Sequence, residues 1–178
     1  MNKSVLIVSS SPRKGGNSDL LCDRFAEGAT LSGHQVEKIF LNDKKINYCK
    51  GCAECFDTGK CSQEDDMTGI LEKLISADVI VMATPVYFYT MCGQMKTMID
   101  RCCARYNEIT NKDFYFIVTA AVDSRQSVMR TIEGFRCFTT CLTGPKEKGL
   151  IFGTGVWNAG SVKDMESMTE AFELGKSV

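Results

Sequence analysis

The sequence has little that would draw it to a polyanion or into a membrane. Its 178 residues carry 21 basic and 22 acidic side chains, and the formal net charge is −1. This balance argues against nucleic acid or an anionic membrane surface as a partner. The N-terminal stretch "MNKSVLIVSSS" has a run of only four strongly apolar residues, too short for a secretion signal or a membrane span. We therefore expect a cytoplasmic protein with no membrane partner.

Side chains suited to acid–base catalysis are also scarce. The one histidine, His34, opens a predicted edge strand far along the sequence from the predicted ligand-binding loops, which favours a surface role. Asp65 and Asp66 are explained better as an N-terminal helix cap than as a catalytic pair. No Ser/His/Asp set can be argued, and we predict no catalytic side chain.

The ten cysteines, in contrast, are many for the cytoplasm, where structural disulfides seldom persist. Six are scattered through predicted helices and are expected to pack as small hydrophobes: Cys22, Cys92, Cys102, Cys103, Cys137 and Cys141. The other four crowd one predicted loop with the spacing C-x2-C-x2-C-x5-C: Cys49, Cys52, Cys55 and Cys61. The second group is the candidate for metal or redox chemistry.

Strand and helix patterns alternate along the chain. Short runs rich in apolar and β-branched residues predict strands over 3–10, 34–41, 78–85, 113–121 and 150–157. Apolar residues at helical spacing predict helices over 18–32, 65–77, 91–103, 125–141 and 164–174. No linker or repeat interrupts them, so we predict a single α/β domain over 1–178. Right-handed crossovers then give one parallel sheet with helices on both faces.

The first candidate ligand loop is "SSSPRKGGNS" (9–18), directly after the first predicted strand. In an open parallel sheet, ligands bind beyond the carboxyl ends of the strands. The loop offers hydroxyls, an amide, a guanidinium and glycine: Ser9, Ser11, Ser18, Asn17, Arg13 and Gly16. It leads into a helix N-terminus, which favours an anion, and a cradle made mainly of hydroxyls suits one phosphate monoester. An ordinary capped strand–helix turn is the alternative.

The second candidate loop, "TPVYFYT" (84–90), places three aromatic side chains directly after a buried strand. Pro85 stiffens the turn, and exposed backbone groups there can contact the edge of a flat heterocycle. Tyr87, Phe88 or Tyr89 can supply a stacking face. The alternative is an aromatic patch for subunit contact, and both roles can hold together.

Three stretches in this order resemble a known family: "SSSPRKGGNS", the pattern C-x-G-C-x-x-C…G-x-C…DDM, and "ADVIVMATPVYFYTMCGQMKTMIDR". They are similar to the NADPH-dependent FMN reductase and iron–sulfur flavoprotein group of flavodoxin-like proteins, strongly over residues 1–105. The resemblance implies a flavodoxin-like three-layer sandwich with a five-stranded parallel sheet in the order 2-1-3-4-5. It also implies bound FMN and NAD(P)H as the electron donor.

The resemblance also implies roles for individual residues. Ser11, Arg13, Asn17 and Ser18 would hold the FMN phosphate. Pro85, Val86, Tyr87 and Phe88 would contact the isoalloxazine ring, and the loop after the fourth strand, with Thr119, Ala120 and Asp123, would complete the pocket. Two features depart from the family pattern: Ser10 stands where glycine is usual, and "TAAVDSR" lacks the glycines common in the third loop.

A flavin performs the electron transfer itself, and the protein supplies binding, orientation and electrostatics. We therefore expect an FMN-dependent NAD(P)H oxidoreductase that passes electrons to a quinone, a flavin or a redox protein, as a homodimer or homotetramer. The alternative is an iron–sulfur flavoprotein or flavodoxin-like electron carrier without NAD(P)H turnover of its own. A zinc-stabilised interaction protein without flavin is a third hypothesis.

Three interpretations of the four-cysteine segment stay open. Four thiolates from one compact loop are the usual ligands of a [4Fe–4S] cluster, with Cys49, Cys52 and Cys55 at three corners and Cys61 at the fourth. The second interpretation is a metal-free thiol loop, which could cover the flavin of a neighbouring subunit. Zinc is less favoured, because structural zinc usually takes two separated C-x2-C pairs.

Overall fold

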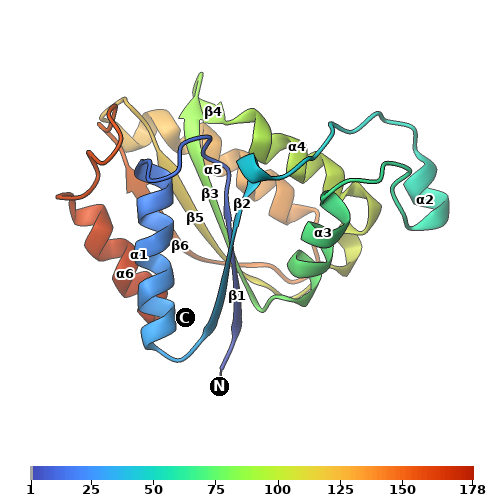
Figure 1. The fold of residues 1–178 in the computed structure, drawn as a ribbon, viewed down its shortest axis with the longest axis horizontal. Helices are drawn as coiled ribbons and strands as arrows, with labels where there is room; N and C mark the ends of the chain where they lie inside the picture. Colours follow the sequence, from blue (N-terminus) through green and yellow to red (C-terminus); the bar gives the residue numbers. More distant parts are fainter. Residues whose placement is uncertain (1) are drawn as a thin grey trace.

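A three-layer α/β sandwich is seen in the computed structural model, which describes residues 2–178 (Figure 1). Parallel strands form the sheet in the order β2-β1-β3-β5-β6. Their bounds are β1 Ser4–Ser9, β2 Gln35–Phe40, β3 Val79–Tyr87, β5 Asp113–Thr119 and β6 Lys146–Gly153. A further short strand, β4 (Thr90–Met91), pairs antiparallel with the end of β3.

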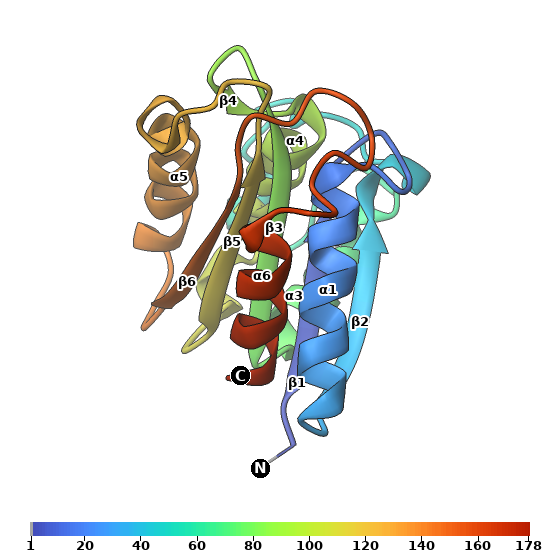
Figure 2. The ribbon, with the colours of Figure 1, turned by 90° about the vertical axis from the view of Figure 1, so that its left-hand side faces the viewer.

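Helices cover both faces of the sheet (Figures 1 and 2). One face carries α1 (Asn17–Leu31) and α6 (Glu166–Lys176), and the other carries α3 (Met67–Ser76), α4 (Gly93–Arg101) and α5 (Arg125–Thr140). The shorter elements are α2 (Glu54–Thr58) and the 3-10 turns η1 (Leu41–Asp43), η2 (Cys102–Ala104) and η3 (Tyr106–Glu108). Within residues 2–178, every helix is too short or too polar to cross a membrane.

Two apolar layers fill the space between sheet and helices. Alternate residues of β1 point to opposite sides, so Val5 and Ile7 pack under α1 and α6 whereas Leu6 and Val8 pack under α3, α4 and α5. β3 is buried from Val79 to Thr84, because it lies in the middle of the sheet with helices on both sides. This burial explains its nearly continuous apolar sequence.

The helices α1 and α6 touch through their backbones, and glycine makes this possible. A Cβ atom added to Gly28 would lie 2.1 Å from the Phe172 carbonyl oxygen, and one added to Gly175 would lie 2.1 Å from that of Phe25. No larger residue fits at either position without moving a helix. The contact fixes α6 against α1, the helix that begins at the first ligand loop. It thereby also limits where the loop before α6 can lie.

The predicted α/β class, with helices on both faces, is confirmed. The sheet itself differs from the predicted five strands in the order 2-1-3-4-5, because the antiparallel strand β4 adds a sixth strand and shifts the numbering. The residues predicted as an aromatic loop, 84–90, instead continue β3 to Tyr87 and turn back into β4. Tyr87 and Thr90 pair across this hairpin, which two-residue turns permit.

The last strand was misplaced by the prediction. It runs over Lys146–Gly153 and not over 150–157, so residues 146–149, which lie before the predicted strand, belong to the sheet. β6 is an edge strand, where charged side chains such as Lys146 and Glu147 can point into solvent. After Gly153 the chain leaves the sheet, and Val156 is buried there whereas Trp157 is exposed.

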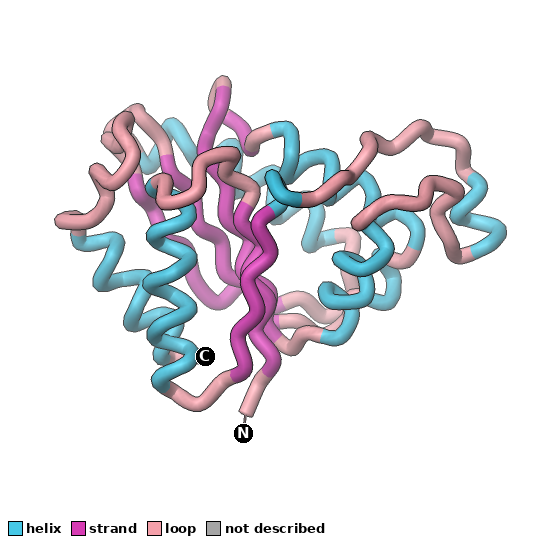
Figure 3. Tube along the Cα trace, in the orientation of Figure 1, coloured by secondary structure: helices cyan, strands magenta, loops and turns pink. Residues whose placement is uncertain are grey.

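The cysteine segment projects from the sandwich between η1 and α3 (Figure 3). It was predicted as a loop throughout, but the one-turn helix α2 forms inside it. Left-handed backbone at Ala53 (φ 64°) and Gly59 (φ 67°) begins and ends this helix. No residue of α2 is buried, so local turns rather than a core hold it.

Candidate functional site

A pocket of about 200 Å³ opens at the carboxyl ends of β1, β3 and β5. It brings together the first ligand loop, the end of β3, the loop after β5 and the loop after β6. Its lining residues are Ser11, Arg13, Gly16, Asn17, Ser18, Pro85, Val86, Tyr87, Thr119, Ala120, Ala121, Val156, Trp157 and Ala159. The position is the one that parallel sheets use for ligands.

One end of the pocket is the N-terminus of α1. The first N–H groups of a helix have no acceptor within it, and no side chain caps α1. The preceding loop folds on itself, since the Arg13 N–H donates to Ser11 Oγ at 3.2 Å. A Cβ on Gly16 would lie 3.0 Å from the Arg13 carbonyl oxygen, so the tight turn favours glycine. These donors and the helix dipole favour a phosphate group.

Two side chains of this helix start are also tied to neighbouring loops. The hydroxyls of Ser18 and Thr119 lie 2.6 Å apart and join α1 to the end of β5. The Asn17 amide nitrogen donates to the Asn158 carbonyl at 2.9 Å, and its oxygen accepts from the Val162 N–H at 3.3 Å. Asn17 therefore holds the loop after β6 in place beside the pocket.

Another part of the pocket lining includes two aromatic side chains, Tyr87 and Trp157. Pro85, Val86 and Tyr87 come from the end of β3, and Trp157, 77% exposed, comes from the loop after β6. The tip of the β3–β4 hairpin is unusual, because Phe88 (φ 49°) and Tyr89 (φ 64°) both adopt left-handed backbone. Such turns normally contain Asn or Gly, and bulky residues there store strain of about 1–3 kcal/mol each. Strain of this kind concentrates at functional sites.

A buried hydrogen-bond network joins Ser10 and Thr84, the residues directly before Ser11 and Pro85 of the pocket lining. The Ser10 hydroxyl donates to the Ala83 carbonyl at 2.8 Å, and the Cys92 thiol lies 3.2 Å from the Ser10 carbonyl oxygen. The Cys92 N–H donates in turn to Thr84 Oγ at 3.1 Å. Ser10 therefore adds a side-chain bond between the end of β1 and β3, a bond that a glycine at this position could not make.

Most of the predicted cofactor residues line this one pocket, and three do not. Ser9 is buried in the sheet, Phe88 is fully exposed at the hairpin tip, and Asp123 lies outside the lining. The prediction missed the lining residues of the loop after β6, of which Trp157 is the largest. The available signal was a lone tryptophan near glycines at the end of the last strand, but the misplaced strand hid it.

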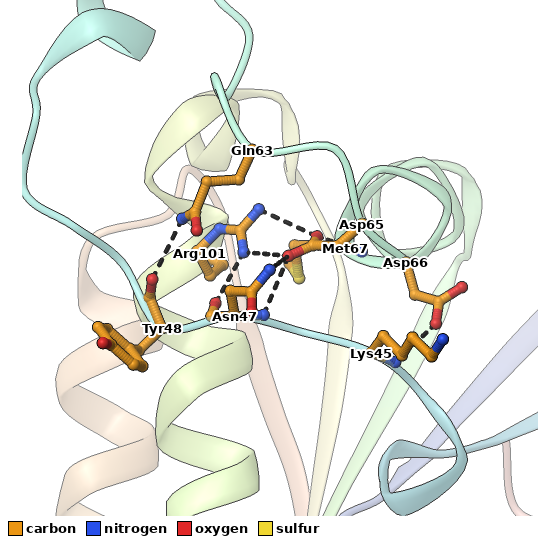
Figure 4. A network of polar contacts seen from close by, with 8 residues as sticks. All are labelled: Lys45, Asn47, Tyr48, Gln63, Asp65, Asp66, Met67 and Arg101. Atoms are coloured by element: carbon orange, nitrogen blue, oxygen red, sulfur yellow. Dashed lines mark hydrogen bonds and ion pairs between the residues drawn. The ribbon is translucent and has the colours of Figure 1, made fainter.

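A buried ion pair closes the base of the cysteine segment (Figure 4). Arg101 Nη1 donates to Asp65 Oδ2 and to the Asn47 carbonyl, both at 2.7 Å, and Nη2 donates to Asp65 Oδ1 at 3.1 Å. Asp65 also accepts from the Asn47 N–H at 3.0 Å and the Met67 N–H at 3.1 Å. The side chains of Arg101 and Asp65 are 1% and 3% exposed. We call this group the loop clamp: Asn47, Asp65 and Arg101.

The clamp changes the electrostatics of its carboxylate. Burial alone would raise the pKa of Asp65, but the hydrogen bonds from Arg101 and from the backbone N–H groups of Asn47 and Met67 outweigh it and lower that pKa. Asp65 and Asp66 were predicted as a helix cap, and Asp65 does accept from the first turn of α3. Its pairing with Arg101 was not predicted from the sequence.

The four cysteines beyond the clamp are not gathered around one point. Cys49 and Cys52 are exposed, and Cys55 and Cys61 are half-buried. In the part of the chain that is described, residues 2–178, no three Cys, His, Asp or Glu side chains are placed to hold a metal ion. The cysteines as they lie do not fit a [4Fe–4S] cluster, and that site stays a prediction.

The sequence is similar to those of known flavoproteins. The family model of NADPH-dependent FMN reductases matches residues 4–137. An iron–sulfur flavoprotein of Archaeoglobus fulgidus is 35% identical over 179 residues, covering 99% of this chain and 78% of that protein.

Solved structures share the fold at lower identity. An NAD(P)H:quinone oxidoreductase from Methanothermobacter marburgensis has a TM-score of 0.78 at 13% identity, covering 99% of this chain and 97% of that one. An FMN-dependent NADH-azoreductase from Bacillus anthracis in complex with FMN has a TM-score of 0.74 at 16% identity, covering 98% of each chain. The chain therefore belongs to the NADPH-dependent FMN reductase family and is an oxidoreductase.

Proposed function

We propose that this protein binds FMN in the pocket at the carboxyl ends of β1, β3 and β5 and passes electrons from NAD(P)H to a quinone, a flavin or a redox protein. The observation that carries the proposal is the pairing, in one pocket, of an uncapped helix start with an aromatic wall. A phosphate monoester and a flat ring in the same ligand require this pair of environments. FMN has both, and bound FMN supplies the hydride and electron transfer.

The phosphate end would be held by the loop before α1 and by the first residues of that helix. Ser11 and Ser18 offer hydroxyls, and Arg13 is exposed beside the pocket, where its guanidinium can reach a phosphate. Thr119 orients the Ser18 hydroxyl through their 2.6 Å contact. These groups bind and orient the cofactor, and none of them needs to move a proton.

The ring end would be held by Pro85, Val86 and Tyr87, together with Trp157 from the loop after β6, which lines the same pocket. Backbone groups of β3 near its end can bond to the edge of a heterocycle, and the aromatic side chains limit the access of water. The nicotinamide and the acceptor would then enter from the side that these exposed aromatics surround. Exposed rings are suited to flat acceptors such as quinones.

The test is FMN binding measured with matched hydroxyl variants. Ser18→Ala should weaken FMN binding about tenfold or more, as expected for loss of a hydrogen bond to a charged group. Ser76→Ala, at the exposed end of α3, should leave it unchanged. Binding is followed by flavin fluorescence, and NAD(P)H oxidation is followed with quinone, free FMN and ferric acceptors. Absence of FMN binding, or binding without reduction by NADH or NADPH, would reject the proposal.

The second candidate function is that of an iron–sulfur flavoprotein, with an iron–sulfur cluster as well as FMN. It is favoured by the four cysteines that the loop clamp presents on one short segment and by the family of the relative from Archaeoglobus fulgidus. Because the thiols are not assembled as they lie, a cluster would require Cys49, Cys52, Cys55 and Cys61 to converge. Iron and acid-labile sulfide are assayed in anaerobically purified protein, and about four of each per chain would support it.

A homodimer or homotetramer and a cytoplasmic location complete the proposal. The exposed aromatic residues around the pocket mouth, Tyr87, Phe88, Tyr89 and Trp157, are suited to contact with a second copy. Light scattering on the purified protein, with and without FMN, measures the assembly directly. A monomer under both conditions would remove this part of the proposal.

A further inference from the structure

The cysteine segment folds back over η2, the turn that follows α4. The loop clamp fixes its base at Arg101, directly before η2. Residues of α2 and η2 approach within 8 Å, Cα to Cα. On the other side, a cavity of about 290 Å³ is lined both by Gly59, Lys60 and Cys61 of the segment and by Ala104 of the η2 turn. The clamp beside η2, the approach of α2 to η2 and the shared cavity all place the segment next to η2.

This arrangement brings a cysteine from outside the motif to the segment. Cys103 lies in the middle of η2 and is half-buried, as is Cys55 in the first turn of α2. Cys103 was predicted to pack as a core hydrophobe, and its neighbour Cys102 does so at 1% exposure. Burial raises the pKa of Cys103, and the nearby thiols of Cys55 and Cys49 raise it further, which agrees with their proximity.

We propose that Cys103 and Cys55 form a reversible disulfide that joins α2 to η2. The chemistry uses a low-molecular-weight disulfide as oxidant. One protein thiolate attacks it and releases one small thiol, and the second protein thiolate attacks the mixed disulfide and releases the other. The protein pair loses two electrons and two protons, and the small disulfide is reduced to two thiols, so the exchange balances.

The bond would make the segment a redox-responsive element. Joined to η2, Cys55 can no longer serve as a metal ligand or as a reactive thiol, and α2 is held against the body of the protein. Reversible disulfides in reducing compartments commonly serve as sensors rather than as structural bonds. The proposal does not depend on FMN binding, so it can fail or hold separately from the proposed function.

The principal competitor is a bond within the C-x2-C pair of Cys52 and Cys55. Cys52 is exposed, and its sulfur lies 3.6 Å from the Ser62 hydroxyl. Trypsin separates the two possibilities, because cleavage after Lys50 and Lys60 leaves both of these cysteines in one peptide. Cys103 is released in a different peptide, Cys102–Arg105. A bond to Cys103 joins two peptides, whereas the competing bond joins none.

The experiment uses the full-length protein as purified, with iron and FMN assayed on the same sample. It is exposed to oxidised glutathione, free thiols are blocked with N-ethylmaleimide, and the tryptic digest is analysed without reduction. We expect the peptides 51–60 and 102–105 to be joined, a loss of about two titratable thiols per chain, and reversal by dithiothreitol. Cys55→Ser and Cys103→Ser should each abolish the joined peptides.

Two variants control for the neighbouring thiols. Cys52→Ser and Cys102→Ser should both retain the joined peptides, and circular dichroism establishes that each variant is folded. A bond confined to peptide 51–60, glutathione adducts without joined peptides, or joined peptides that persist in Cys103→Ser would each overturn the proposal. Failure to form any bond in the wild-type protein would overturn it as well.

Discussion

The substitution Asp65→Asn tests how strongly the loop clamp holds the cysteine segment. It keeps the shape of the side chain and removes the charge that Arg101 faces. Five hydrogen bonds reach this carboxylate at 2.7–3.3 Å: two from Arg101, two from the backbone and side-chain amides of Asn47, and one from the Met67 N–H. With Arg101 only 1% exposed, the variant leaves a buried charge without its partner.

Breaking a buried pair in this way costs about 3–5 kcal/mol, a large share of the roughly 5–15 kcal/mol that stabilises a domain. For a domain of this size, the thermal midpoint should fall by about 6–20 °C. Urea unfolding followed by circular dichroism measures the free energy directly. The matched control is Asp100→Asn, which removes an exposed pair with Lys96 and should cost no more than about 0.5 kcal/mol.

The pH dependence supplies a second arm of the same test. The pKa of Asp65 is lower in the folded protein than in the unfolded chain. The stabilisation that the ionised carboxylate contributes to the free energy of unfolding is therefore complete above the unfolded pKa, about pH 4. It is lost as the pH falls through the folded pKa. The stability difference between wild type and Asp65→Asn should therefore narrow below about pH 4. A difference under about 1 kcal/mol at pH 7 would show that Arg101 finds other acceptors and that the reasoning is wrong.

Three further predictions concern the backbone. Replacing Phe88-Tyr89 by Asn-Gly should raise the unfolding free energy by about 1–2 kcal/mol by removing turn strain, while quinone reduction falls more than ferricyanide reduction. Gly28→Ala should cost about 1–3 kcal/mol because its Cβ meets the facing helix, measured by urea unfolding. Gly69→Ala, a helix position with open space around it, should instead stabilise by about 0.5–1 kcal/mol in the same assay, and equal effects of the two would contradict the packing argument.

The sequence was sufficient for the fold class and for most of the pocket. Parallel strands buried on both faces have a distinctive apolar pattern, and ligand loops follow from strand order, so Ser11, Ser18, Pro85 and Thr119 could be placed in one site from sequence alone. These residues lie at the ends of strands or the start of a helix. Their relative positions follow from the sheet.

What escaped prediction depends on contacts between segments far apart in sequence. Trp157 was missed because the stretch 150–157 was predicted as one strand, whereas β6 already ends at Gly153 and Trp157 lies in the loop that follows. The ion pair of Arg101 with Asp65 joins residues 36 positions apart, and such a pair produces no periodic pattern in the sequence. Cys103 could not be told from Cys102 by pattern, because the two adjacent residues differ only in which of them faces the returning loop.

The backbone contact between α1 and α6 has a consequence for how this pocket can diversify. The helix α1, which starts at the pocket, and the helix α6, which follows the Trp157 loop, are in contact at Gly28 and Gly175, and Asn17 bonds that loop to α1. A sequence change on this side must be matched by another across the contact. Phe88 at the β3–β4 hairpin tip is fully exposed and meets no facing helix, so a substitution there needs no matching change elsewhere. Under the proposed function, the range of acceptors could therefore change at the hairpin one substitution at a time, without a change in the residues proposed to bind FMN.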